Sequence, residues 1–294
     1  LQNDKEDFLD KEDILKEDNS MNILTIKNIT KSFGKLDVLD DISVNIKIGE
    51  KVAIIGPSGS GKSTFLRCLN CIEDLTSGQI IFDGVDIADM KVDINIHRQK
   101  MGMVFQHFNL FNNKTVIQNI VMAPNHIMIS NNNKNKRFNF FLPITNLFRK
   151  EKLSKKEILS NKEIKIKNLK KAEELLTSID LLDKKDVFPS TLSGGQKQRV
   201  AIVRALAMEP KVILFDEATS ALDNESQEYI KKTIDNLVDT HTIIIVAHRL
   251  STIMDADQIF VIDDGKVASS GTHDELMKES NIYKKLYSPE VLDC

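Results

Sequence analysis

Tryptophan is absent from this chain of 294 residues, and cysteine occurs only 3 times. An odd number of cysteines without framework spacing excludes a disulfide-stapled secreted domain and favours a reducing compartment. The longest apolar run, residues 242–247, is far shorter than the roughly 20 residues of a membrane-spanning helix. The first twenty residues are too acidic and polar for a secretory signal. If this protein acts at a membrane, we therefore expect it to bind an integral partner.

A strong charge of either sign is also missing. The 40 lysines and arginines stand against 43 acids, and a net charge of −3 gives no general attraction for nucleic acid or acidic lipid. The charges are distributed unevenly along the chain: residues 1–20 carry acid in excess, whereas residues 131–171 are strongly basic. The composition is that of an ordinary folded protein, and the length allows one large α/β domain or two small ones.

Patterning along the chain divides it into segments. We expect residues 1–20 to form a flexible acidic leader, because a segment so rich in charge cannot support a core. A short amphipathic helix at residues 8–15 is the alternative. In the second half, strands alternate with helices, which indicates a mainly parallel α/β sheet. By periodicity and glycine boundaries, the predicted strands are 24–29, 39–46, 51–55, 79–82, 212–215, 242–246 and 259–262, and the predicted helices are 61–72 and 225–237.

Residues from about 125 to 170 differ from the rest of the chain. Asn131–Asn133 and the lysine-rich stretches after them are low in complexity and predict a basic, solvated insertion. Helical periodicity resumes at residue 172. An expanded loop is the simplest interpretation; contact with a membrane surface or an integral membrane partner, or with RNA, is the alternative, although no nucleic-acid fold signature accompanies the segment. The alternatives rest on Phe138, Phe140, Phe141, Leu142, Leu147 and Phe148, interleaved with Arg137, Arg149 and Lys150.

A glycine-rich loop follows the apolar strand at residues 51–55. Its glycines let successive N–H groups point at phosphate oxygens, and a helix beginning near Lys62 adds its positive N-terminal end. Lys62 supplies a point charge for the β- and γ-phosphates, and Ser63 supplies a hydroxyl for Mg²⁺. The whole pattern is that of a nucleotide phosphate loop: Gly56, Pro57, Ser58, Gly59, Ser60, Gly61, Lys62, Ser63 and Thr64.

A second apolar strand, residues 212–215, ends in Asp216 and Glu217. Ligands bind at such strand ends in open α/β sheets. Asp216 suits the second shell of Mg²⁺, and Glu217 is placed to polarise the attacking water as general base. The alternative is that these two acids are an ordinary pair on the surface. Two acids at the end of a buried strand would, however, be costly without a cation nearby.

Cys68 and Cys71 form a C-x-x-C pattern within the helix predicted at residues 61–72. The simplest interpretation is two small buried residues on one face of that helix. A metal site would need a second ligand pair, and the sequence offers none.

Residues 192–199, LSGGQKQR, resemble the signature sequence of ABC ATPases and lie just before the second acidic strand, as in that family. Ser193, Gly194 and Gly195, followed by Gln196, open a helix and form a second anion site. The resemblance implies an ABC-type P-loop NTPase of the α/β class over residues 21–288, with a tail at 289–294. It also implies an N-terminal antiparallel β subdomain and an inserted helical subdomain at about 107–207, which carries the 125–170 insertion.

Further positions match motifs of that family in order. Phe33 matches the aromatic residue that stacks on adenine, although a core role is the alternative, and Gln106 matches the glutamine that reaches Mg²⁺ and water and senses the transporter. Residues 220–223, which end in Asp223, match the loop that is exchanged across the dimer in that family. His248 matches the histidine that contacts the γ-phosphate. The intact Glu217 distinguishes this chain from degenerate members that do not hydrolyse ATP.

Two halves of the chain resemble different ABC ATPases. Residues 67–70, 76–78, 102–111 and 121–124 are similar to the ATPases of polar amino-acid importers, whereas residues 216–220, 247–253 and 271–276 are more similar to exporter ATPases. Exporter ATPases are commonly fused to a transmembrane domain, and this sequence shows none. For that reason, and because the region near Gln106 is importer-like, we favour amino-acid import; an exporter or a non-transport ATPase acting on nucleic acid or ribosomes is the alternative.

The resemblance also implies cofactors, partners and a location. ATP and Mg²⁺ would bind between two subunits of a head-to-tail dimer, most simply a homodimer, with the signature of one subunit covering the ATP of the other. The dimer would work with an integral membrane permease, and in the full system with a solute-binding protein. We expect a peripheral position on the cytoplasmic face of the cell membrane and no direct contact with nucleic acid.

Overall fold

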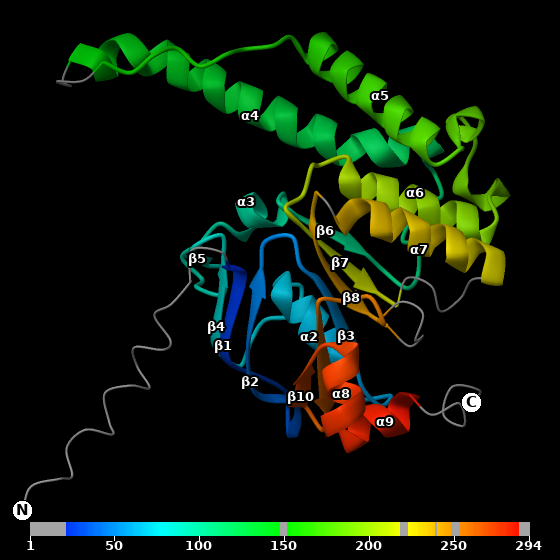
Figure 1. Cartoon of the computed structure of the whole chain (residues 1–294). Helices are drawn as coiled ribbons and strands as arrows, with labels where there is room; N and C mark the ends of the chain where they lie inside the picture. The colour runs from blue at the N-terminus through cyan, green and yellow to red at the C-terminus, as the bar shows by residue number, and fades with distance from the viewer. Residues whose placement is uncertain (1–21, 148–151, 218–222, 239, 248–252, 288–294) are drawn as a thin grey trace, which may run out of the picture. The chain divides into compact units, whose positions relative to one another are not determined.

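The computed structural model describes residues 22–147, 152–217, 223–238, 240–247 and 253–287. The chain forms two compact units. The first comprises the residues up to Met101, Val212–Glu217 and those from Ile234 onward, and the second comprises Gly102–Lys211 and Ala218–Thr233. The second is therefore inserted into the first, and the elements of both are shown in Figure 1.

An antiparallel sheet opens the first unit. Its strands are β1 (Asn22–Phe33), β2 (Leu36–Lys47), β4 (Ser77–Phe82) and β5 (Val85–Asp86), in the order β2-β1-β4-β5. Along β2, buried and exposed residues alternate from Ile42 to Lys47 with the period of two expected of a strand that covers a core on one face. This confirms the predicted N-terminal antiparallel sheet.

The second sheet has the order β10-β9-β3-β8-β7-β6. Strand β3 pairs in parallel with β8 and β9, and β7 pairs in parallel with β8. Every residue of β3, β7 and β8 is buried, as expected for central parallel strands. The strands are β3 (Lys51–Ile55), β6 (Met101–Val104), β7 (Val212–Asp216), β8 (Thr242–Val246), β9 (Gln258–Asp263) and β10 (Lys266–Gly271).

Four of the helices that the structure describes lie wholly within the first unit: α2 (Lys62–Leu69), α3 (Ile94–Arg98), α8 (His273–Glu279) and α9 (Asn281–Tyr287). Because β3 and β7 both run parallel to β8, their carboxyl ends meet at one edge of the sheet. The loop before α2 leaves the sheet at that edge, where Asp216 ends β7 and Glu217 follows it.

Helix α2 is shorter than predicted. It ends at Leu69, because Cys71 has a left-handed backbone (φ 48°). The N–H of Cys71 donates to the carbonyl of Cys68, and the N–H of Ile72 donates to that of Arg67. This pair of bonds is the Schellman ending of a helix. Cys71 therefore lies beyond the helix, and the prediction that both cysteines share a helical face was wrong. Burial raises the pKa of both thiols, to about 12 for Cys68 and about 11 for Cys71, so neither is a reactive thiolate.

Helices dominate the second unit. They are α4 (Val116–Leu147), α5 (Asn161–Ser178), α6 (Gly194–Leu206) and the first part of α7 (Asn224–Val238), with short 3₁₀ turns at Leu182–Lys184 and Pro189–Thr191. None of the helices that the structure describes is long and apolar enough to cross a membrane. The unit has its own core, formed by Val116, Ile117, Ile120, Ala172, Leu176, Ile179, Leu181, Leu192, Val200, Val203 and Ala207.

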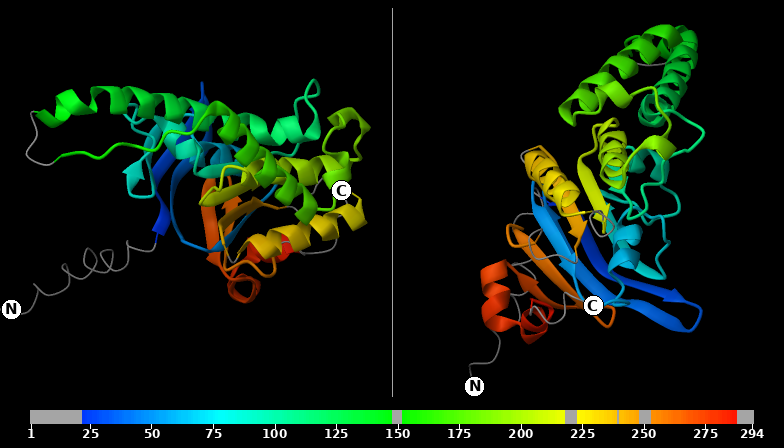
Figure 2. Two further views of the ribbon diagram at one scale, coloured as in Figure 1. Left: turned by 90° about the horizontal axis from the view of Figure 1, so that it is seen from above. Right: turned by 90° about the vertical axis from the view of Figure 1, so that its right-hand side faces the viewer.

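The segment predicted as a low-complexity insertion is helical over much of its length. It includes the greater part of α4 and the first half of α5, joined by a run without helix or strand at residues 152–160. Figures 1 and 2 show this run lying back along α4. Pro124 and Pro143 lie inside α4, where each lacks the N–H that would complete the helix.

Three asparagines of α4 each make two hydrogen bonds to residues 152–160, and Asn135 adds a single bond to the carbonyl of Glu157 at 3.2 Å. The side-chain amide of Asn132 donates to the carbonyl of Leu159 at 2.7 Å, and its oxygen accepts from the N–H of the same residue at 3.0 Å. Asn139 pairs in this two-bond manner with Lys156, at 2.6 and 2.8 Å. Asn146 pairs likewise with Leu153, at 3.0 and 2.9 Å. We call this set of contacts the asparagine ladder.

The spacing of the asparagine ladder is nearly the same on the α-helix and on the extended run that faces it. Seven residues of α-helix return to nearly the same face and rise about 10.5 Å. Three residues of polyproline II helix complete one turn and rise about 9 Å. Ser160, at the end of the run, has φ −72° and ψ 153°, which are polyproline II values. The same amide geometry therefore repeats at every rung.

The asparagine ladder predicts a local effect of single substitutions. Asn139→Ala removes two hydrogen bonds, each worth about 1 kcal/mol, so the amide of Lys156 should exchange with solvent about 10- to 30-fold faster. Hydrogen exchange measured by mass spectrometry or NMR checks this. Asn133→Ala, at an exposed asparagine of the same helix, is the matched control and should leave exchange unchanged. Equal rates in both variants would contradict the ladder.

Candidate functional site

The loop between β3 and α2 has a backbone that glycine makes possible. Gly59 and Gly61 have φ of 80° and 99°, in the left-handed region, and Gly56 has φ 153°. A Cβ on Gly56 would lie 1.9 Å from the carbonyl oxygen of Ile262, so that position excludes every larger residue. Helix α2 begins directly after Gly61 with no acid in its first turn, which leaves its positive end for an anion.

Lys62 is folded into this loop. Its ammonium donates to the carbonyls of Gly56 at 2.9 Å and Pro57 at 2.7 Å. Burial lowers the pKa of Lys62, an effect that the carboxylate of Glu217 opposes. The hydroxyl oxygen of Ser60 is buried and has no hydrogen-bond partner in the structure. A buried hydroxyl and a concentrated positive charge among backbone N–H groups are what a polyphosphate requires, so these residues fit the phosphates of ATP.

Ser63, in the first turn of α2, connects the loop to the acidic strand. Its hydroxyl donates to Asp216 Oδ1 at 2.7 Å. The other carboxylate oxygen of Asp216 accepts from Arg67 Nη2 at 3.3 Å. Asp216 is only 2% exposed, so these contacts satisfy a carboxylate withdrawn from water. A hydroxyl beside a carboxylate is an oxygen set that Mg²⁺ prefers, and the residues therefore fit this metal.

Glu217 follows Asp216 in an unusual conformation. Its φ is 49°, in the left-handed region that a non-glycine residue enters at a cost on the order of 1–3 kcal/mol. Its N–H donates to the carbonyl of Val246, the last residue of β8. This bond extends the pairing of β7 with β8 by one residue, while the backbone turns the Glu217 side chain out of the strand alternation.

Arg67 was missed by the sequence predictions. The signal was available, because Arg67 follows Ser63 by four residues on α2 and therefore lies on the same helical face. Its guanidinium places a positive charge beside the carboxylate that is the candidate magnesium ligand.

The signature residues open α6 in the second unit. Ser193 is the N-cap: its hydroxyl accepts from the N–H of Gln196, and the Gln196 side chain accepts from the N–H of Ser193. This reciprocal capping box fixes the first turn and uses the Gln196 side chain internally. Gly194 and Gly195 then present a first turn without acids.

Gly195 packs against α7. A Cβ there would lie 2.2 Å from the hydroxyl oxygen of Ser226. The same hydroxyl and the N–H of Ser226 both donate to Asp223, at 3.0 and 2.9 Å, and thereby lower the pKa of that carboxyl. Asp223 thus caps the start of α7, and Ser226 connects it with the signature turn. The cation–π contact of Arg199 with Tyr229, at 4.5 Å, strengthens the packing of α6 on α7.

Gln106 is exposed and follows β6 in the second unit. The residues after it are fastened to α6 by Arg204, which donates to the carbonyls of Phe108 and Asn109. The Gln106 segment and the signature helix are therefore linked within one unit. Nothing in the sequence distinguished Arg204 from an ordinary basic residue in the last turn of a helix.

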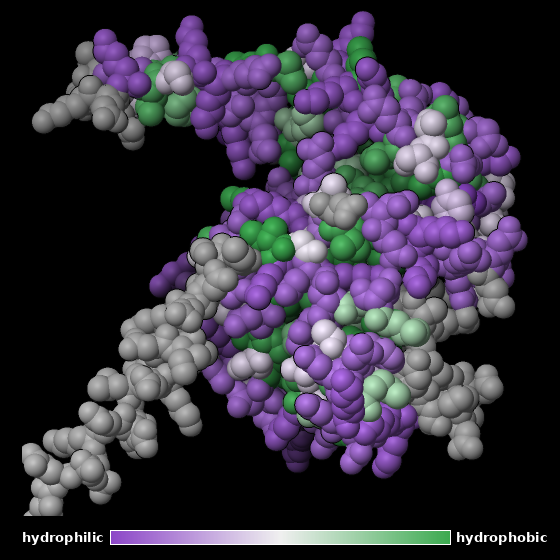
Figure 3. All heavy atoms as spheres, viewed as in Figure 1, coloured by the Kyte–Doolittle hydropathy of each residue, from purple (hydrophilic) through white to green (hydrophobic). Residues whose placement is uncertain are grey.

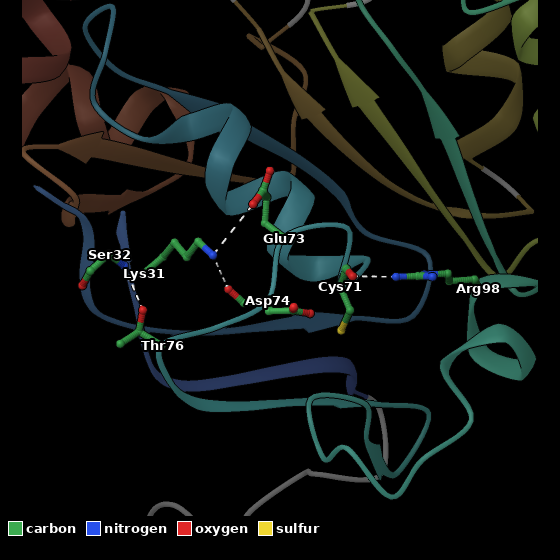
Figure 4. Close-up of polar contacts among 7 residues, drawn as sticks. All are labelled: Lys31, Ser32, Cys71, Glu73, Asp74, Thr76 and Arg98. Atoms are coloured by element: carbon green, nitrogen blue, oxygen red, sulfur yellow. Dashed lines mark hydrogen bonds and ion pairs between the residues drawn. The ribbon is translucent and has the colours of Figure 1, made fainter. Parts of the chain in front are cut away.

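Phe33 ends β1 and is 48% exposed, which does not fit a core role. The ammonium of Lys31 lies 4.6 Å from its ring centroid. Figure 4 shows Lys31 directed toward Glu73 and Asp74; it contacts the Glu73 carboxylate at 3.8 Å and the Asp74 carbonyl at 2.6 Å. Lys31 is thereby held over one face of an exposed aromatic ring.

The predicted site residues fall into two groups in the structure. Lys62, Ser63, Asp216 and Glu217 come together at one edge of the parallel sheet in the first unit, with Phe33 at the end of β1. Gln106, Ser193–Gln196 and Asp223 lie in the second unit. His248 and residues 220–222 lie outside the described residues; Ala247, immediately before His248, is described and follows β8.

Comparison with protein families identifies the chain. The family model described as "ABC transporter" matches residues 39–220, which span the phosphate loop, the signature, Asp216 and Glu217. This chain belongs to the ABC transporter family.

Relatives of this ABC ATPase support the same assignment. This chain is 40% identical over 258 residues to a glutamine transport ATP-binding protein of Escherichia coli, and the match covers 87% of this chain and 94% of that protein. It is 40% identical over 255 residues to an arginine transport ATP-binding protein of Bacillus subtilis, covering 86% and 92%. The predicted resemblance to ABC ATPases of amino-acid importers is confirmed.

Solved structures confirm the predicted fold class. An ATP-binding cassette determined as a dimer in a post-hydrolysis state with ADP and phosphate has a TM-score of 0.64 and 31% identity, covering 85% of this chain and 98% of that one. A bacterial ABC exporter with ATP bound has a TM-score of 0.70 and 30% identity. That match covers 92% of this chain and 42% of the exporter chain.

The contact of Gly195 with Ser226 gives a prediction about the signature turn. Gly195→Ala should destabilise the protein by about 1–3 kcal/mol, because the new methyl group overlaps the Ser226 side chain. With Ser226→Gly the overlapping atoms are gone, so the same Gly195→Ala change should cost far less in that background. Urea unfolding of the two single variants, the double variant and the parent measures the difference. An equal cost in both backgrounds would show that the overlap is absent.

Proposed function

We propose that this ABC ATPase hydrolyses ATP to drive import of an amino acid through a separate integral permease. The observation that carries the proposal is the gathering of Lys62, Ser63, Asp216 and Glu217 at the edge where β3 and β7 end. The relatives named for glutamine and arginine transport support the class of solute. The exporter-like segments of the carboxyl-terminal third do not alter this proposal, since the relatives that match most of both chains are import or transport ATPases.

The residues have separate tasks in this proposal. The N–H groups of the loop and the Lys62 ammonium bind the β- and γ-phosphates, with the Ser60 hydroxyl as an additional donor. Ser63, Asp216 and Gln106 hold Mg²⁺, which when bound neutralises charge on the phosphates. Glu217 accepts a proton from the attacking water, and His248 stabilises the transferring phosphoryl group. Phe33 stacks on the adenine ring.

The proposed working form is a head-to-tail homodimer. Ser193, Gly194 and Gly195 of one subunit contact the γ-phosphate bound by the other, and Asp223 lies at the dimer contact. Closing and reopening of the pair drives the permease between inward-facing and outward-facing states. The ATPase lies peripherally on the cytoplasmic face of the membrane, and a solute-binding protein completes the importer.

Glu217→Gln tests the chemical step. Turnover should fall by about 10²- to 10⁴-fold, the usual contribution of a general base, while ATP still binds. Because bound ATP is not hydrolysed, the closed dimer should persist and elute as a dimer on size exclusion with ATP. Lys62→Ala is the control: it should weaken nucleotide binding and yield no ATP-dependent dimer. Undiminished turnover in Glu217→Gln would remove Glu217 from the proposed role.

The transport role is tested by capturing the chain from gently solubilised native membranes and identifying the bound proteins. Recovery of a multi-span permease together with a solute-binding protein supports import. Recovery of a permease without any solute-binding protein would favour export. Recovery of only ribosomal or DNA-associated proteins would leave the ATP chemistry standing and refute the transport role.

Arg67 gives a prediction about the metal. Its guanidinium competes with a divalent cation for the charge of Asp216, so Arg67→Ala should lower the Mg²⁺ concentration for half-maximal ATPase activity by a few-fold. Arg67→Lys retains the charge and should change this concentration much less. Titrating Mg²⁺ at saturating ATP measures the effect. A higher Mg²⁺ requirement in Arg67→Ala would mean that Arg67 assists metal binding.

A further inference from the structure

The outer part of the second unit carries an exposed apolar face. We call residues 132–147 of α4 together with residues 152–160 the arm. On α4, Phe140 is 75% exposed, Phe141 is 54% exposed and Ile144 is 58% exposed. The rings of Phe140 and Phe141 meet edge to face at 5.1 Å. In Figure 3, green side chains lie among purple ones at the end of this arm, next to the grey residues.

Helix geometry separates this apolar face from the asparagine ladder. At 100° per residue, Phe140, Phe141 and Ile144 lie within about 100° of one another, whereas Asn139 and Asn146 lie on the other side of the helix. The buried Leu142 lies toward the ladder side. The ladder thus occupies one face of α4, and the opposite face keeps three large apolar side chains in solvent.

Both segments of the arm are rich in basic residues. Lys134, Lys136 and Arg137 lie on α4, and the run at residues 152–160 adds three more lysines. Within the described residues of the arm the one acid is Glu157. One of the added lysines, Lys156, extends over the ring of Phe138 at 4.6 Å, so its stem covers apolar surface while its charge remains in water.

This combination favours a lipid surface over a protein partner. The cores of protein interfaces are depleted in lysine, because a lysine there must lose its hydration. At an anionic membrane, the rings enter the region between headgroups and acyl chains while lysines contact the headgroups. The arm has both halves of that pattern, although the chain as a whole carries a net charge of −3 and has no general attraction for anionic lipid.

We propose that the arm docks on an anionic lipid surface, with Phe140, Phe141 and Ile144 inserted among the headgroups and the basic side chains of α4 beside them on lipid phosphates. The asparagine ladder holds the lysine-rich run against the opposite face of α4, so the run adds positive charge to the arm and leaves the apolar face uncovered. This contact goes beyond the proposed transport function and does not depend on which solute or permease is involved.

Flotation with protein-free vesicles tests the proposal on the full chain. The protein should float with vesicles of phosphatidylcholine mixed with phosphatidylglycerol, should not float with phosphatidylcholine alone, and should be released by high salt. Phe140→Ser combined with Phe141→Ser should lower the vesicle-bound fraction about tenfold or more. Ile166→Ser combined with Leu169→Ser, at exposed apolar positions of α5, is the matched control and should float like the parent.

The charge contribution is tested separately. Lys134→Gln combined with Lys136→Gln, at two exposed positions of α4, should lower binding to the anionic vesicles by more than about fivefold and reduce its dependence on salt. ATPase activity of every variant in solution, without vesicles, should equal that of the parent, which shows that each is folded.

Three outcomes overturn the proposal. In the first, the parent chain does not float with anionic vesicles. In the second, the variant with both phenylalanines replaced floats as well as the parent. In the third, a photo-crosslinker at position 140 labels a permease instead of lipid in native membranes, which would make the face a protein interface. Because the vesicles contain no permease, failure of the transport proposal leaves this test unaffected.

Discussion

The hydrogen bond between Ser63 and Asp216 joins two parts of the chain that are 153 residues apart in sequence. It depends on the placement of β8 between β3 and β7, which brings the carboxyl ends of those two strands to one edge of the sheet. The hydroxyl and the carboxylate belong to different elements, so neither strand nor loop forms the site alone. Arg67 completes the neutralisation of Asp216. The packing of the buried strands therefore serves to hold one carboxylate at a fixed distance from the start of α2.

Much of this arrangement could be predicted from sequence. The strands at residues 51–55, 212–215 and 242–246 are short, apolar and fully buried, so their composition identifies them without knowledge of their neighbours. The glycines of the phosphate loop can also be recognised from sequence alone. Gly59 and Gly61 have positive φ, and this need for glycine arises from the local backbone and not from distant contacts. The antiparallel sheet and the inserted helical unit came from the resemblance to ABC ATPases, which the relatives confirm.

Other features could not be predicted, because they depend on contacts between distant residues. The early end of α2 depends on a left-handed Cys71, and cysteine has no special preference for that conformation. Arg204 acts through carbonyl groups near residue 108, and backbone acceptors leave no trace in a sequence. The asparagines at 125, 132, 139 and 146 were interpreted as part of a low-complexity segment, although their spacing of seven is a helical period. Polar residues at that spacing are easily overlooked when only apolar residues are counted.

The matched periods of the asparagine ladder also restrict how this part of the gene can change in length. Deleting one residue from α4 would rotate every later asparagine by about 100° and break all rungs beyond that point. Removing seven residues from the helix and three from the facing run would instead delete one whole rung and leave the others in register. The arm can therefore grow or shrink only in discrete steps of about 10 Å. A change of length that keeps the ladder intact must therefore alter both facing segments together, in the ratio of seven residues to three.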